Sequence, residues 1–189
     1  LAQKIAPHFE GDSASVMDGL NDAATSKRCN VNNNTLMTIV VPNTYSMLWN
    51  ASAEKIINKL YSEKEKFWNT ERVNKAKALN LTPEQVYTMA SIVEEETNKE
   101  PDKGLIASVY MNRINTGIKL QADPTVKFAM KNFGLKRIKH VHLSYDSPFN
   151  TYQHAGLPPG PICTPSTKTI DAVLNAPQTN YIYFVAKPD

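Results

Sequence analysis

Residues 81–97, LTPEQVYTMASIVEEET, carry the clearest helix signal in the chain. Thr82 suits an N-cap, Pro83 suits the first helical position, and Gln85 completes the pattern of a capping box. The apolar residues that follow recur at three- and four-residue steps, which is typical of a helix with one buried face. The stretch therefore predicts a helix that enters the core and ends in three consecutive glutamates.

The three glutamates, Glu94, Glu95 and Glu96, differ in the direction that each side chain takes from this helix. At about 100° per residue, Glu95 lies roughly 155° from the middle of the apolar face and Glu94 roughly 105°. Glu96 lies only about 50° away and continues the buried stripe. Burial of a carboxyl group raises its pKa towards the range useful to a general acid, so Glu96 is the candidate for chemistry. The alternative is that the core ends here and Glu96 is an ordinary exposed glutamate.

Helical patterns also dominate the rest of the chain. The expected helices cover residues 1–9 and 13–22, a long stretch from Ser52 that restarts near Asn69, 103–115, the residues from Pro124 to Gly134 with Asp123 as cap, and 168–175. Two apolar, β-branched or aromatic stretches read as strands instead: 38–41, which Pro42 ends, and YIYFVA at 181–186. Many helices with a few strands predict an α+β fold.

The composition is that of an ordinary globular protein, with 189 residues, 41% apolar residues and a net charge of +3. No arginine-rich or lysine–aromatic cluster is present, so nucleic acid is not an expected partner. No apolar run approaches the roughly 20 residues of a membrane span. Cys29 and Cys163 stand far apart without nearby histidines, and whether they pair stays open. His140 and His142 read as surface histidines rather than a metal pair, so we expect neither a metal nor a cofactor.

Four stretches occur in an order and spacing that resemble the signature blocks of one family. They are ASIVEEET (90–97), ASVYMNRINTGIKLQADPTVKFAM (107–130), SPFNTYQHAGLPPGPICTPS (147–166) and YIYFVA (181–186), and VPNTY (41–45) resembles a further block. Together they are similar to the endolytic murein transglycosylases, the MltG or YceG-like family. The resemblance implies a lyase of bacterial cell wall biogenesis, a lytic transglycosylase that cuts nascent peptidoglycan strands.

The resemblance also implies the catalytic residue and the reaction. The later acidic residue of the family's A-S-x-x-E-x-E block is catalytic, and it falls on Glu96; the earlier one falls on Glu94. A protonated Glu96 would donate to the oxygen of the β-1,4 bond between N-acetylmuramic acid and N-acetylglucosamine, then act as base while the sugar's own 6-hydroxyl closes a 1,6-anhydro end. An intramolecular nucleophile has a high effective concentration, so no second, water-activating carboxylate is needed.

The other matching positions are implied to bind sugar or to orient the catalytic carboxyl group. With Glu94, these expected substrate-binding residues are Asn112, Arg113, Gln121, Asp123, Thr125, Asn150, Thr151 and Tyr152. For Asp123 a purely structural role as helix cap is the alternative.

The same resemblance suggests how the chain is organised and where it works. Residues 1–35 would be an N-terminal helical segment that packs on a YceG-like catalytic domain, 36–189, which is truncated at its C-terminal end. We expect a soluble fragment of a parent protein whose LysM-like region and membrane anchor lie outside this chain. The parent would be anchored in the bacterial inner (cytoplasmic) membrane, with the catalytic region on the periplasmic, or extracytoplasmic, side.

The expected partners are peptidoglycan glycan strands and cell-wall synthases. Two other functions remain open from the sequence: a non-catalytic peptidoglycan-binding module, and a scaffold of the cell-wall elongation machinery.

Overall fold

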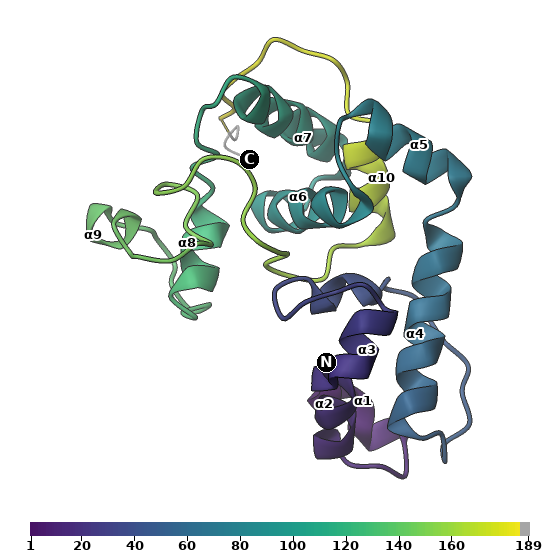
Figure 1. The fold of residues 1–189 in the computed structure, drawn as a ribbon. Helices are drawn as coiled ribbons and strands as arrows, with labels where there is room; N and C mark the ends of the chain where they lie inside the picture. Colours follow the sequence, from purple (N-terminus) through teal and green to yellow (C-terminus); the bar gives the residue numbers. More distant parts are fainter. Residues whose placement is uncertain (186–189) are drawn as a thin grey trace.

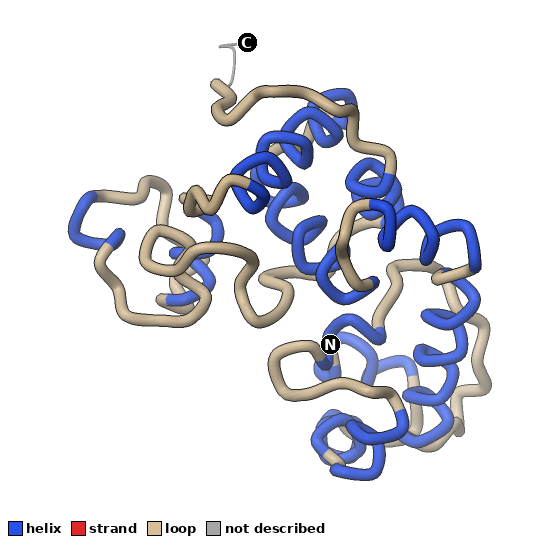
Figure 2. The backbone as a smooth tube through the Cα atoms, turned by 45° about the horizontal axis from the view of Figure 1, so that its top comes forward, coloured by secondary structure: helices blue, strands red, loops and turns tan. Residues whose placement is uncertain are grey.

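The computed structural model describes residues 1–185, and helices account for all regular secondary structure in that range (Figures 1 and 2). In chain order the elements are α1 (Ala2–Ile5), the 3-10 helix η1 (Ala6–His8), α2 (Ser13–Asn21), α3 (Ala23–Arg28), the 3-10 helix η2 (Leu36–Ile39), α4 (Ala53–Phe67), α5 (Thr70–Ala78), α6 (Pro83–Glu96), α7 (Glu100–Asn115), α8 (Asp123–Ala129), α9 (His140–Leu143) and α10 (Thr167–Leu174). The fold is therefore helical, and the expected α+β class is wrong.

Neither stretch that we expected to be a strand forms one among the described residues. Residues 38–41 contain the end of η2, and their side chains are all buried. The carbonyl oxygen of Val40 accepts a hydrogen bond of 2.7 Å from the hydroxyl of Tyr87 on α6. Residues 181–185 form an irregular, exposed segment, and Ala186 lies outside the described residues. A β-branched stretch becomes a strand only when a second segment pairs with its backbone.

Helices were predicted more accurately than strands, because the sequence signals of a helix lie within the helix itself. The capping box of α6 is present: the Thr82 hydroxyl accepts from the Gln85 N–H at 3.2 Å, and the Gln85 side chain accepts from the Thr82 N–H at 2.9 Å. The long helix from Ser52 is α4, and the chain restarts as α5 with Asn69 as N-cap. These helix predictions are confirmed.

The apolar side chains form two cores, and Figure 1 shows the corresponding two lobes. The first core lies among α5, α6, α7, α8 and α10, with α6 packed against both α7 and α10. The second lies among α1, α2, η2 and α4, and we call this part the N-terminal lobe. The N-terminal helices thus share their core with α4, although α4 lies after residue 35, where we expected the N-terminal segment to end. Within residues 1–185, no helix is long and apolar enough to cross a membrane.

The proline-rich loop that follows Gly156 reaches the N-terminal lobe at Gly160. A Cβ atom on Gly160 would lie 1.9 Å from the backbone oxygen of Asn34, so only glycine permits this approach. The loop belongs to the stretch that carries Tyr152, so this contact ties the N-terminal lobe to the part of the chain expected to hold substrate.

We expect Gly160→Ala to lower the free energy of unfolding by about 2 kcal/mol, because the new methyl group must push two backbones apart. Urea unfolding measures the change. Gly134→Ala is the matched control, since the nearest atom that a Cβ there would meet is Asn132 Oδ1, at 3.9 Å. Equal unfolding free energies for the two variants would contradict the close approach.

Candidate active site

Glu96 is the last residue of α6, and its side chain is partly buried. Tyr110, itself buried on α7, donates its hydroxyl hydrogen to Glu96 Oε1 at 2.7 Å. Burial raises the pKa of Glu96, and the charge of Asp123 adds to the rise, while the Tyr110 hydrogen bond opposes it without cancelling it. A carboxyl group that is held in one orientation and has a raised pKa is suited to donate a proton as a general acid.

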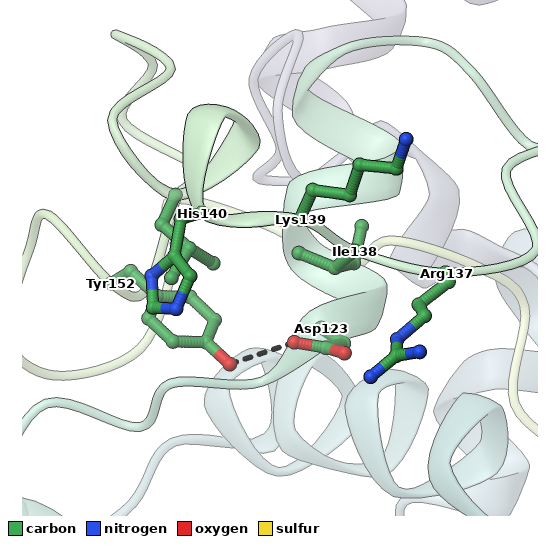
Figure 3. A pocket seen from close by; sticks show the side chains of 7 residues that line it. Asp123, Arg137, Ile138, Lys139, His140 and Tyr152 are labelled. Atoms are coloured by element: carbon green, nitrogen blue, oxygen red, sulfur yellow. Dashed lines mark hydrogen bonds between the residues drawn. The ribbon is translucent and has the colours of Figure 1, made fainter.

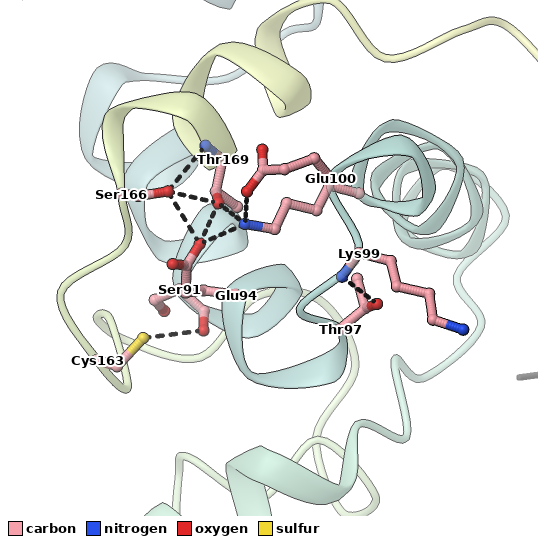
Figure 4. A network of polar contacts seen from close by, with 9 residues as sticks. Ser91, Glu94, Thr97, Lys99, Glu100, Cys163, Ser166 and Thr169 are labelled. Carbon is pink, nitrogen blue, oxygen red and sulfur yellow. Dashed lines mark hydrogen bonds and ion pairs between the residues drawn. The ribbon is translucent and has the colours of Figure 1, made fainter. Parts of the chain in front are cut away.

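The other two glutamates point elsewhere. Glu95 is exposed. Glu94 turns into the junction of α6, α7 and α10, where it accepts hydrogen bonds from the Thr169 hydroxyl, from Lys103 Nζ at 3.2 Å and from Ser166 Oγ at 3.3 Å (Figure 4). Burial alone would raise the pKa of Glu94, but the hydrogen bonds from Thr169 and Lys103 outweigh it and lower the pKa. The structure gives Glu94 a structural role, and a role in substrate binding stays a prediction.

Asp123 and Tyr152 form a hydrogen-bonded pair beside Glu96. The Tyr152 hydroxyl donates to Asp123 Oδ1 at 2.7 Å (Figure 3). The expected cap role of Asp123 is wrong, because Ala122 is the N-cap of α8 and Asp123 is its first residue. Burial, the Asp123 hydrogen bond and the charges of Asp123 and Glu96 all raise the pKa of Tyr152. Glu96, Tyr110, Asp123 and Tyr152 thus form one cluster, which we call the Glu96 site.

Buried hydroxyl groups hold the Asp123–Tyr152 pair in place. The Oγ1 atoms of Thr125 and Thr151 lie 2.8 Å apart, and Thr151 Oγ1 also accepts from the Ala122 N–H at 3.0 Å. The neighbouring Gln121 donates its backbone N–H to the Thr151 carbonyl at 3.1 Å, while its side chain is exposed. These threonines join the start of α8 to the loop that carries Tyr152.

Asn150 shapes the same loop from inside. Its buried side chain donates to the carbonyl oxygens of Leu143 at 3.0 Å and Tyr145 at 2.8 Å, and its oxygen accepts from the Tyr152 N–H at 3.0 Å. Three of the expected sugar-binding residues, Thr125, Asn150 and Thr151, are therefore enclosed and support the site rather than line it.

Asn112 and Arg113 hold the C-terminal segment against α7. Asn112 Nδ2 donates to the carbonyl oxygens of Thr179 at 2.8 Å and Tyr181 at 2.9 Å. Arg113 Nε donates to the Ile182 carbonyl at 2.7 Å. Both side chains are thus occupied by backbone groups, and their expected contact with sugar stays a prediction.

Tyr110 is the functional residue that sequence reasoning missed. An aromatic residue inside a helix looks like a core residue, and its hydroxyl partner lies on another helix, 14 residues away in sequence. A search for polar partners of a buried tyrosine would have found it. Among residues 1–185, no group of three or more His, Cys, Asp or Glu side chains is placed to hold a metal ion; His140 is exposed, and the half-buried His142 accepts from the Lys139 N–H at 3.1 Å.

Comparison with known proteins agrees with the resemblance seen in the sequence. The model of the YceG-like family matches residues 3–189. The endolytic murein transglycosylase of Bacillus subtilis is 36% identical over 136 residues, which cover 72% of this chain and 37% of that protein. The endolytic murein transglycosylase of Streptococcus pneumoniae is 33% identical over 153 residues, which cover 77% of this chain and 27% of that protein.

A crystal structure of a YceG-like protein from Listeria monocytogenes superposes with a TM-score of 0.82 at 28% identity. The superposition covers 97% of this chain and 65% of that one. The chain therefore spans well under half the length of these curated relatives and just under two thirds of the solved one.

Proposed function

Because this chain belongs to the YceG-like family, we propose that it is the catalytic part of an endolytic peptidoglycan lytic transglycosylase with Glu96 as its acid and base. The observation that carries the proposal is the environment of Glu96: partly buried, with a raised pKa and one oxygen held by Tyr110. The names of the two curated relatives support murein as the substrate.

The reaction begins with protonated Glu96, which donates its proton to the oxygen that links N-acetylmuramic acid to N-acetylglucosamine. The bond from C1 of the muramic acid to that oxygen breaks, and its electron pair leaves with the oxygen. The 6-hydroxyl of the same muramic acid then attacks C1, and the Glu96 carboxylate takes the hydroxyl proton. Glu96 is restored, no water is consumed, and a 1,6-anhydro end results.

Two neighbours assist this sequence. The Tyr110 hydroxyl keeps the Glu96 carboxyl oriented in both protonation states, because its hydrogen bond at 2.7 Å is compatible with each. The Asp123 carboxylate, held by Tyr152, places negative charge beside the site where positive charge develops on the sugar ring.

For the whole protein we propose a membrane anchor that holds the catalytic region on the extracytoplasmic side of the cytoplasmic membrane. Nascent glycan strands and cell-wall synthases are found on that side. The activity of the relatives supports this location, because murein is assembled there.

Incubation of purified murein with the chain, followed by mass spectrometry of the glycan ends, tests the proposed function. New 1,6-anhydro ends support a transglycosylase. Murein that sediments with the protein but remains uncut would favour a non-catalytic binding module.

The pH dependence of cleavage tests the role of Tyr110. We expect Tyr110→Phe to move the high-pH limb of the rate profile to higher pH, because the hydrogen bond that lowers the pKa of Glu96 is lost and burial acts unopposed by it. The acid form is present below the pKa and is lost as the pH rises through it, so a higher pKa extends activity upwards. The maximal rate falls on the order of tenfold as orientation is lost.

Measurement of kcat/KM from acid to alkaline pH checks this prediction. Tyr145→Phe is the control, because this exposed tyrosine lies outside the Glu96 site. A limb that stays in place, or moves to lower pH, would contradict the assignment of Tyr110.

A further inference from the structure

The segment 124–145, which holds most of α8 and all of α9, is strongly basic. It contains five of the chain's 21 Lys and Arg residues and none of its 18 Asp and Glu residues. The segment therefore has a formal charge of +5, while the rest of the chain, with sixteen basic and eighteen acidic residues, has −2. In Figure 1, α9 stands to one side of α6, α7 and α10, and α8 lies between α9 and α6.

Part of this charge lines a cavity of about 450 Å³ next to the Glu96 site. Arg137, Lys139 and His140 line it together with Asp123 and Tyr152. Figure 3 shows the Arg137 guanidinium group and the His140 ring on either side of the Asp123–Tyr152 pair. Asp123 and Tyr152, which belong to the Glu96 site, also line this cavity, so the cavity adjoins the site.

The side chains of Arg137 and Lys139 have no acidic partner among residues 1–185. Asp123, the acidic residue of the cavity, accepts the Tyr152 hydroxyl. An oxyanion that enters the cavity can therefore bind Arg137 without displacing a partner within the described chain.

The chemistry of murein supplies such an oxyanion close to the bond that Glu96 would cleave. In peptide-bearing glycan the lactyl carboxyl group of muramic acid is tied up as an amide, so the sugars are uncharged and the stem peptide supplies the free carboxylates. A guanidinium group presents a planar fork that matches a carboxylate. On the basis of the proposed function, we propose that Arg137, Lys139 and His140 bind a stem-peptide carboxylate, so that the site selects glycan with a charged stem peptide over glycan whose lactyl group is a neutral amide.

An anionic lipid surface is the competing partner for a basic segment, and Phe133 and Val141 are exposed on the same segment. A lipid surface would use the lysines of the whole segment equally. The cavity instead concentrates Arg137 and His140 next to Asp123 and Tyr152, which favours a ligand that also reaches the Glu96 site.

Binding of a disaccharide–tripeptide, N-acetylglucosaminyl-N-acetylmuramyl-tripeptide, tests the proposal without any turnover, because this molecule lacks the scissile bond. Titration calorimetry compares it with the same disaccharide in which a neutral lactyl methylamide replaces the peptide, because a free lactyl group would itself be a carboxylate. We expect the peptide-bearing form to bind about tenfold more tightly, as one charge-assisted contact would give. Arg137→Gln is expected to remove that tenfold difference.

Lys131→Gln is the matched control, since this exposed residue has the same charge in the same segment but does not line the cavity. Equal affinity for the two disaccharides, or equal losses in Arg137→Gln and Lys131→Gln, would overturn the proposal. A third result would also overturn it: both variants lose binding to phosphatidylglycerol vesicles while their affinity for the muropeptide is unchanged. That result would indicate that the segment binds a lipid surface. If murein is not cleaved but the tenfold difference depends on Arg137, the proposed function fails and the carboxylate site stands.

Discussion

Glu96→Gln is expected to slow the formation of 1,6-anhydro ends by about a thousandfold or more, with the free energy of unfolding unchanged or raised. The amide is nearly the same size as the acid and still accepts the Tyr110 hydrogen bond, but it has no proton to donate. General acid–base catalysis contributes about 10²–10⁴-fold to such rates, and here one group serves as both acid and base. Replacing a partly buried carboxyl group of raised pKa also removes a desolvation cost from the fold.

The measurement is the initial rate of glycan cleavage, with urea unfolding on the same samples. Glu95→Gln is the control, because this exposed neighbour undergoes the same chemical change one residue away. A fully active Glu96→Gln variant would show that the acid lies elsewhere.

Glu94→Ala is expected to do the opposite: it should lower the free energy of unfolding by about 2–4 kcal/mol and leave the cleavage rate of the folded protein unchanged. The Lys103 side chain is only 4% exposed, and the variant leaves its ammonium group with Glu100 as its remaining acidic partner. Removing one member of a buried pair costs more than the pair contributed, because the other charge stays desolvated. Any cleavage that remains should scale with the folded fraction.

Urea unfolding of Glu94→Ala, and of a double variant with Lys103→Met, measures this loss. The double variant should recover part of the stability, since it removes the stranded charge. The pKa of Glu94 is lowered below its ordinary value of 4.5, so its contribution is complete above that pH and is lost as the pH falls through the lower, folded value. The stabilities of Glu94→Ala and the unaltered protein should therefore converge in acid. A stable but inactive Glu94→Ala would contradict this division of roles.

The directions of the glutamates were predictable because they follow from one helix. The capping box set the start of α6, the apolar steps set its buried face, and the rotation per residue then turned Glu95 outward and Glu96 towards the core. All of these signals lie within the 14 residues of α6 and its N-cap, Thr82. The structure bears out both directions.

The errors concern contacts between distant residues. Residues 38–41 have a strand pattern, but the Val40 carbonyl is satisfied by Tyr87, 47 residues away. Asp123 resembles a cap, but Ala122 takes the cap position and the Asp123 carboxylate accepts from Tyr152, 29 residues further on. Asn112 and Arg113 also have partners that no local pattern revealed, a segment near residue 180, and their contact with sugar stays a prediction. A local pattern cannot distinguish an external ligand from a distant part of the same chain.

The central claim is that Glu96 drives cleavage without water, and digestion of murein in heavy-oxygen water tests it most directly. Mass spectrometry of the new ends should show 1,6-anhydromuramic acid without heavy oxygen, and no such ends with Glu96→Gln. New reducing ends that carry heavy oxygen would contradict the claim and identify a hydrolase.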